Sequence, residues 1–229
     1  MLESIISTEE IQRDRMPAAF VEWFDGFLEK TRVDRSNREQ ILLRQGIAKP
    51  VYEEVFPLYR LLNHKQAEWA NRTFRNVLGN QSYDVVVTGP GDNRSSFMEI
   101  TVADVDQAES VRMEEFARVG RVPALAPVEW SGTRRGGRQV HISEDMLLHD
   151  DVVAKKKAQL IAAVERKALH ACQADTALLV YFDDYTAFAD ANDWPVMDEI
   201  LRAVHEVWRT RFSALYIVGA SGRGFWQSE

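Results

Sequence analysis

Apolar side chains in the first third of the chain recur every three or four positions, a spacing that predicts helices. The clearest stripe follows Pro17, a residue that suits the first turn of a helix, and consists of Phe20, Val21, Phe24, Phe27 and Leu28. The pattern breaks at Gly46 and Pro50 and then resumes. The last helix of this region is expected to be interrupted at Pro57 and to end at Gly79.

The pattern then changes to short apolar runs, which predict strands. The runs at 82–89 and 95–103 flank a turn rich in Pro, Gly, Asp and Asn, so we expect them to pair as a hairpin. A second short hairpin is expected around residues 131–138. Two nearly continuous apolar runs, at 176–182 and 214–220, predict strands that are buried on both faces.

Helices are predicted between these strands, at 105–120, 150–169 and 194–212. Because helices separate the last strands, the sheet is expected to be mixed rather than purely antiparallel. The fold class is therefore predicted to be α/β, with a mixed central β-sheet flanked by helices. A helical N-terminal segment at 1–59 is expected to precede an α/β domain at 60–229.

Composition and charge narrow the class of protein. The chain has 229 residues and a net charge of −7, which counts against a protein that coats nucleic acid but allows an enzyme with a local basic cleft. Its single cysteine, Cys172, excludes an internal disulfide and a multi-cysteine zinc site. No stretch approaches the roughly 18 apolar residues of a membrane span, and the charged N-terminus does not fit a signal peptide. A cytoplasmic protein without a membrane partner is expected.

Glu99 stands inside the predicted strand at 95–103, where a buried carboxylate is costly unless it is paired, protonated or bound to a cation. Asp84 stands early in the preceding strand, so the hairpin is expected to bring the two carboxylates together at the end away from its turn. Adjacent carboxylates repel each other, and Mg²⁺ or Mn²⁺, which prefer oxygen ligands, would remove the repulsion. The alternative is that Glu99 reaches solvent or pairs with an arginine.

This order of elements, with Asp in one strand of a hairpin and Glu in the next, resembles the PD-(D/E)XK nuclease superfamily. The matching residues are Asp84 and Glu99, and the segment Glu-Ile-Thr at 99–101 stands where the family has Glu-x-Lys. The resemblance covers roughly residues 60–183. It implies a restriction-endonuclease-like fold in which Asp84 and Glu99 hold Mg²⁺ or Mn²⁺ for the hydrolysis of phosphodiester bonds. Thr101 departs from the motif because it replaces the lysine.

The resemblance then requires a lysine from another element. Lys157 is the best candidate, because it shares a face of the predicted helix with Val153, Leu160, Ile161, Val164 and Ala168. The alternative is that Lys157 only covers the end of the core face. The resemblance also implies that Glu68, on the helix before the strands, is an extra metal ligand. The alternative for Glu68 is a surface ion pair with Lys65 or Arg72.

Basic residues also gather at the tip of the second hairpin, where Arg134, Arg135 and Arg138 are suited to contact DNA phosphates, or form an ordinary solvated loop. The sequence thus predicts a metal-dependent nuclease that acts on DNA. The alternative is a catalytically inactive protein of the same fold that serves as a protein-interaction or nucleic-acid-binding module. A protein partner or a homo-oligomer is compatible with both functions.

Overall fold

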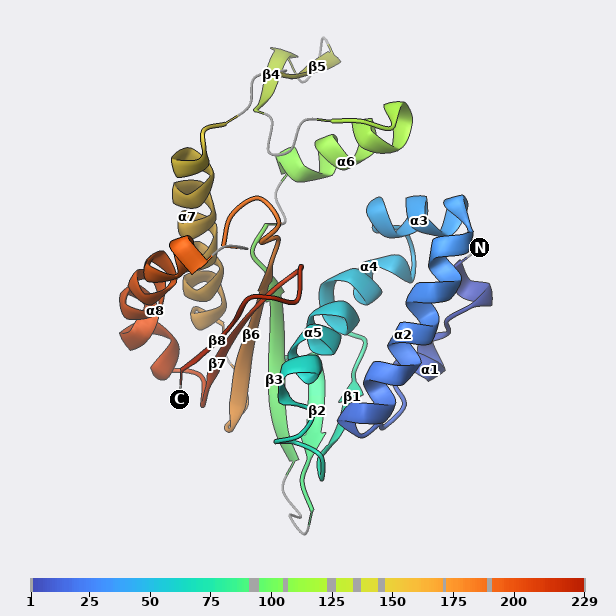
Figure 1. The fold of residues 1–229 in the computed structure, drawn as a ribbon, viewed down its shortest axis with the longest axis vertical. Helices are drawn as coiled ribbons and strands as arrows, with labels where there is room; N and C mark the ends of the chain where they lie inside the picture. Colours follow the sequence, from blue (N-terminus) through green and yellow to red (C-terminus); the bar gives the residue numbers. More distant parts are fainter. Residues whose placement is uncertain are drawn as a thin grey trace.

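The computed structural model describes residues 2–90, 95–104, 107–122, 127–133, 137–143, 147–170, 172–188 and 191–228. Within these residues, six strands form one mixed sheet with helices on both faces, and two further strands pair apart from it (Figure 1). The predicted α/β class and the mixed central sheet flanked by helices are therefore confirmed. The part of the chain so described contains no helix that is both long and apolar enough to cross a lipid bilayer.

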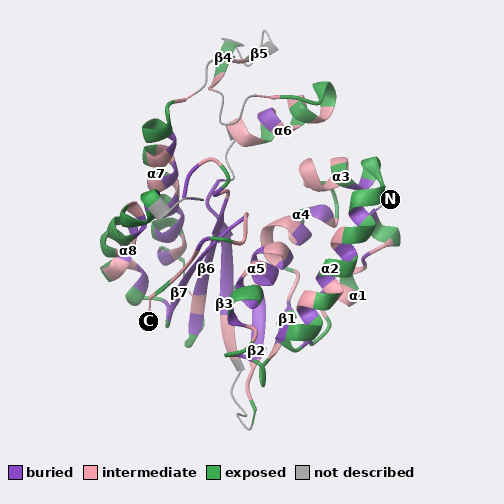
Figure 2. Cartoon of the chain, in the orientation of Figure 1, coloured by how far each residue is buried: buried purple, intermediate pink, exposed green. Residues whose placement is uncertain are grey.

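The central sheet consists, in spatial order, of β1 (Thr73–Asn76), β2 (Val85–Thr88), β3 (Ser95–Val102), β6 (Thr176–Phe182), β7 (Leu215–Gly219) and β8 (Phe225–Ser228). β1, β2 and β3 are antiparallel neighbours, so β2 and β3 form the predicted hairpin. β6 and β7 continue the sheet in parallel with β3, and β8 is antiparallel to β7. Figure 2 shows that the strands in the middle of the sheet are largely buried, as expected where helices cover both faces.

The N-terminal helices cover one face of the sheet. They are η1 (Leu2–Ser4), α1 (Thr8–Ile11), α2 (Pro17–Val33), α3 (Arg35–Leu42), α4 (Ala48–Pro50), η2 (Val51–Val55) and α5 (Phe56–Lys65). Phe20 and Phe24 of α2 and Leu58 of α5 share a buried core with Ile100 of β3 and Leu179 of β6. This core joins the helical N-terminal region directly to the strands.

The opposite face is covered by η3 (Ala191–Asp193), α7 (His149–Ala168) and α8 (Trp194–Arg209). Side chains of β6 alternate between the two cores, as the pleat of a strand requires. Leu178, Val180 and Phe182 pack against α7 and α8, whereas Leu179 and Tyr181 belong to the core beneath the N-terminal helices. The continuous apolar run of this strand is thus explained by burial on both sides, as predicted.

The segment between β3 and α7 holds α6 (Gln107–Val119), β4 (Val128–Thr133) and β5 (Gly137–Ile142). These elements lie beyond the end of the sheet rather than over one of its faces, and they are more exposed than the strands (Figures 1 and 2). β4 and β5 pair as the predicted second hairpin. Gly120 follows α6 with a φ of +78°, which is the left-handed conformation that glycine commonly adopts after a helix.

The prediction of a helix up to Gly79 was wrong. α5 ends at Lys65, and the chain then turns and forms β1. Backbone hydrogen bonds join Phe74 to Arg15 in both directions, at 2.8 and 3.0 Å, and the Phe74 ring is buried beside that of Trp69. Arg15 is distant in the sequence, and pairing with it and with β2 outweighs the local helical pattern.

Two further details differ from the sequence pattern. After the apolar run at 214–220, the chain turns and returns as a further strand, β8, which the sequence pattern does not predict. The expected boundary between residues 59 and 60 falls inside α5, a helix that contributes to the core on both sides of that position.

Candidate functional site

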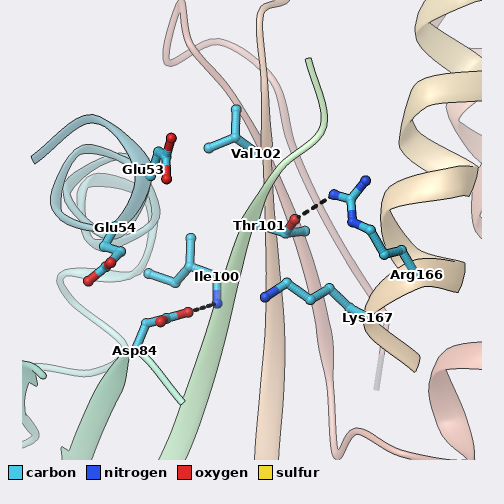
Figure 3. A pocket seen from close by; sticks show the side chains of 8 residues that line it. All are labelled: Glu53, Glu54, Asp84, Ile100, Thr101, Val102, Arg166 and Lys167. Carbon is cyan, nitrogen blue, oxygen red and sulfur yellow. Dashed lines mark hydrogen bonds between the residues drawn. The ribbon is translucent and has the colours of Figure 1, made fainter. Parts of the chain in front are cut away.

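β3 has an open edge beyond the point where β2 begins. β2 starts at Val85, which is opposite Met98, so the last four residues of β3 have no partner in β2. Asp84 lies at this opening, and its backbone N–H donates to the Met98 carbonyl at 2.9 Å. Its Oδ2 accepts a hydrogen bond of 2.6 Å from the Ile100 N–H (Figure 3). The Asp84 side chain therefore takes the place of a missing strand partner, which fixes the carboxylate at the opening.

Side chains at the end of β3 alternate between the two faces of the sheet. Ile100 and Val102 enter the core beneath the N-terminal helices. Glu99 and Thr101 face α7, where each meets a basic side chain. The open edge is consequently accessible to groups from helices on both sides of the sheet, as Figure 3 shows.

Lys167 of α7 provides the partner that a carboxylate inside a strand requires. Its Nζ lies 2.7 Å from Glu99 Oε1, with side-chain exposures of only 23% for Lys167 and 10% for Glu99. The preceding residue, Arg166, donates a hydrogen bond of 3.1 Å from Nη2 to Thr101 Oγ1. Two consecutive basic residues of α7 thus reach two alternate residues of β3.

Two acidic side chains face the opening from the N-terminal helices. Glu53 and Glu54 belong to η2, a π-helical turn that lies just before Pro57 in the first turn of α5. Proline removes one helical hydrogen bond, and π-helical turns are frequent at functional sites. A cavity of about 300 Å³ is lined by these two glutamates, Asp84, Ile100, Thr101, Val102, Arg166 and Lys167 (Figure 3).

Burial makes two carboxyl groups of this cavity, those of Glu54 and Asp84, difficult to ionise. The pKa of Glu54 is raised from 4.5 to about 8, chiefly by loss of water and further by repulsion from Asp84 and Glu53. The pKa of Asp84 is also raised, chiefly by burial, although the Ile100 N–H and Lys167 act in the opposite direction. A cation bound among these carboxyl groups would therefore stabilise their ionised forms.

Two buried carboxylate oxygens, Glu54 Oε2 in the cavity and Glu99 Oε2 at the end of β3, accept no hydrogen bond. Buried polar atoms are seldom left in this state, so each is an available ligand oxygen. Among the described residues, no group of three or more His, Cys, Asp and Glu side chains is arranged to hold a metal ion. Mg²⁺ is commonly held by one or two carboxylates together with water and substrate oxygens, and the oxygen donors present fit that kind of site.

Of the predicted site residues, Asp84 and Glu99 are brought to the same opening, but Lys157 is not. Lys157 Nζ lies 2.6 Å from Glu199 Oε2 on α8, in a partly exposed ion pair. Lys167, which does contact Glu99, is ten residues further along α7, or about 15 Å at the rise of a helix. The buried stripe of α7 consists of Val152, Lys156, Leu160, Ala163, Val164 and Ala168. It shares several positions with the predicted stripe, so spacing alone did not identify Lys167 as the lysine that contacts Glu99.

Glu68 also lies outside the cavity. Glu68 lies in the turn after α5, and its Oε2 is 2.5 Å from Nζ of Lys65. The ion pair with Lys65 expected as the alternative is therefore found, with Glu68 57% exposed but Lys65 only 6% exposed. Arg134 and Arg135 lie outside the described residues, and Arg138 belongs to β5. DNA contact by these arginines remains a prediction.

Sequence reasoning missed four charged residues of the cavity: Glu53, Glu54, Arg166 and Lys167. A signal for Lys167 was present, because it follows Leu160 by seven positions and Val164 by three and so extends the same helical stripe. A signal for Glu54 was weaker, since it consists only of an acidic pair within an otherwise apolar helical stretch.

No protein-family model, no curated protein and no solved structure matches this chain. The function is therefore inferred from the geometry of the site.

Proposed function

We propose that this chain is a metal-dependent nuclease of the PD-(D/E)XK superfamily, with the restriction-endonuclease-like fold, that hydrolyses phosphodiester bonds in DNA. The topology supports the proposal, because an antiparallel hairpin is followed by helices and by a strand parallel to β3. Asp84 precedes one strand of that hairpin and Glu99 lies in the other, in the order of the family's motif. The observation that carries the proposal is the convergence of these carboxylates and Lys167 at the open edge of β3.

In this proposal Asp84 and Glu99 hold Mg²⁺ or Mn²⁺, and Glu54 takes the assisting role that the family resemblance implied for Glu68. The bound ion supplies Lewis-acid stabilisation of charge on the phosphoryl oxygens. Lys167 places a positive charge beside Glu99, where it can stabilise the negative charge that develops on the phosphate.

A second candidate function is a catalytically inactive module of the same fold that binds protein or nucleic acid. Thr101 favours it, because a neutral hydroxyl stands in the strand position that carries the motif lysine. The Lys167–Glu99 ion pair also favours it, because Glu99 already has a cationic partner without a metal. The two functions differ in whether the site binds a divalent cation and breaks a phosphodiester bond.

Metal binding is the first test. Mn²⁺ or Mg²⁺ at millimolar concentration is expected to raise the Tm, because a ligand that binds only the folded state stabilises it. Glu99→Gln is expected to abolish this rise while leaving a protein with an unchanged circular dichroism spectrum. Titration calorimetry of the unmodified chain should show the same binding directly, and its absence at millimolar metal would overturn the nuclease proposal.

Cleavage is the second test, with two lysines of one helix as a matched pair. Lys167→Ala is expected to reduce Mg²⁺-dependent cleavage of plasmid and linear DNA by about 100-fold or more, as for loss of a group that stabilises transition-state charge. Lys157→Ala is expected to keep normal activity, because Lys157 pairs with Glu199. Equal loss in both variants would contradict the role of Lys167. Metal binding without cleavage of duplex DNA, single-stranded DNA or RNA would favour the second function.

A further inference from the structure

Arg166 reaches the same cavity as Lys167 but has a different kind of partner. Lys167 is held by the Glu99 carboxylate, whereas Arg166 donates to the neutral Thr101 hydroxyl. Within the described parts of the chain, no carboxylate lies at ion-pair distance from Arg166. Its positive charge at the cavity therefore remains available to an anion (Figure 3).

Thr101 fixes the direction in which the guanidinium points. Thr101 is only 6% exposed, and its backbone lies opposite Val180 in the parallel ladder of β3 and β6. The hydroxyl therefore has a fixed position in the sheet. One N–H of Arg166 is used by this hydroxyl, and a guanidinium has five in a rigid planar fork. The remaining N–H groups are suited to two oxygens of one anion.

We propose that Arg166 binds two oxygens of the substrate phosphate, with Thr101 as the positioning residue that orients it. A guanidinium matches the geometry of a phosphate through two parallel hydrogen bonds, which an ammonium cannot provide. The two basic residues of α7 then have separate roles: Lys167 forms an ion pair with Glu99 beside the metal-binding carboxylates, and Arg166 binds the substrate phosphate. This assignment rests on the proposed nuclease function, because it names the group that binds the phosphodiester.

Kinetics of DNA cleavage provide the first measurement. Arg166→Ala is expected to lower kcat/KM by about 10- to 100-fold, as for loss of a charged hydrogen bond, with most of the change in KM. Arg166→Lys is expected to recover only part of this loss, because lysine lacks the fork. Thr101→Val is expected to raise KM less than Arg166→Ala does, and Thr101→Ser to restore it. The control is Arg202→Ala, an exposed arginine of α8 that donates to a backbone carbonyl of its own helix.

The salt dependence of DNA binding provides a second measurement, which a purely structural role would not change. Binding is followed by fluorescence anisotropy of a labelled oligonucleotide in Ca²⁺, in place of Mg²⁺. Loss of one phosphate contact reduces the slope of log Kd against log salt by about 0.7 for single strands and about 0.9 for duplex. Arg166→Ala should show this reduction, whereas Thr101→Val and Arg202→Ala should keep the normal slope.

The outcomes separate this inference from the proposed function. Normal KM and normal salt slope in Arg166→Ala, in a chain whose cleavage depends on Lys167, would overturn the role of Arg166 alone. DNA binding with the predicted change of slope but no cleavage by the unmodified chain would overturn the nuclease and keep Arg166 as a phosphate-binding residue. Absence of both binding and cleavage would overturn both.

Discussion

Asp84 and Glu99 carry the same charge but have different partners in the folded protein. Asp84 accepts one hydrogen bond from the Ile100 N–H, and burial raises its pKa, so its ionised form is disfavoured. Glu99 is instead held by the ammonium group of Lys167. Neutralising the two residues should therefore have different effects on stability, whereas mutual repulsion alone would predict stabilisation from both changes.

Asp84→Asn is expected to raise the free energy of unfolding by about 1 kcal/mol in the absence of metal. The amide keeps an acceptor for the Ile100 N–H and removes a desolvated charge. Glu99→Gln is expected to lower the free energy of unfolding by up to about 1 kcal/mol, because Lys167 loses its charged partner. Urea unfolding near neutral pH with a chelator measures both. Equal stabilisation by the two changes would show that the Lys167 ion pair does not contribute to stability.

Glu54 is expected to make stability depend on pH. Its pKa is about 8 in the folded protein against a usual value of 4.5, so the folded state retains a proton that the unfolded chain releases between these values. This contribution is complete at low pH and is lost as the pH rises through about 8. The free energy of unfolding without metal should therefore fall between about pH 4.5 and about pH 8 and level off above that.

The matched variants for this effect are Glu54→Gln and Glu53→Gln, two adjacent residues of η2. Glu54→Gln should reduce the fall in stability, because the amide does not ionise, and it should be more stable than the unmodified chain at high pH. Glu53→Gln should keep most of the fall. If both variants follow the pH dependence of the unmodified chain, Glu54 is ionised at neutral pH in the folded state.

A second and more deeply buried ion pair joins α7 to the strands. Lys156 is 1% exposed, and its Nζ lies 2.7 Å from Oδ1 of Asp104, two residues after β3. Oδ2 of Asp104 accepts a hydrogen bond from the backbone N–H of Asp183, which directly follows β6. The carboxyl ends of two parallel strands are thereby attached to the helix that also carries Lys167.

Lys156→Met is expected to lower the free energy of unfolding by about 3–5 kcal/mol, because it leaves the Asp104 carboxylate buried without its closest cation. Adding Asp104→Asn should recover at least half of this loss, since the amide oxygen can still accept from the Asp183 N–H. Lys157→Met, at an exposed neighbour, should change stability by less than about 0.5 kcal/mol. Urea unfolding measures all three. If the double variant Lys156→Met with Asp104→Asn is as unstable as Lys156→Met alone, the loss of stability comes from packing rather than from the unpaired Asp104 carboxylate.

The elements that the sequence predicted correctly are those with strong local patterns. β6 and β7 are continuous apolar runs, and α8 has apolar residues at helical spacing after a proline. β1 and β8 have four residues each and are specified by the strand edges that they join, which no local pattern reveals. The phase of α7 was also ambiguous, because Leu160 and Val164 fit both the predicted and the observed stripe.

The candidate site is assembled from segments that lie far apart in the sequence. Charged groups come from η2, from the residue before β2, from Glu99 near the end of β3 and from the end of α7. The proximity of Asp84 and Glu99 was predictable from the hairpin, because its turn fixes which residues of the two strands lie opposite each other. The choice between Lys157 and Lys167 depended on how α7 crosses the sheet, which is a property of the tertiary packing.

The core shared by the N-terminal helices and the sheet predicts that residues 60–229 do not fold alone. Phe20, Phe24 and Val55 are fully buried against a core that includes Leu179 and Tyr181 of β6. Each such side chain contributes about 1.5–3 kcal/mol when buried, and the whole fold of a domain is stable by only about 5–15 kcal/mol. Removal of the N-terminal helices would therefore expose one face of the sheet, and the loss from these three side chains alone, about 4.5–9 kcal/mol, is comparable with the stability of a whole domain.

The fragment 60–229 is expected to lack a cooperative urea transition, to lose near-ultraviolet circular dichroism and to bind a hydrophobic dye, whereas the full chain should unfold in a single transition. The fragment would also lack Glu54, because η2 precedes residue 60. Removal of only residues 2–6 is a milder control, because these residues place two side chains, Leu2 and Ile6, in the core and leave α2 and α5 intact. That control should unfold cooperatively with a reduced midpoint. A cooperative transition with native near-ultraviolet signal in the fragment would show that the sheet and its C-terminal helices are an independent domain.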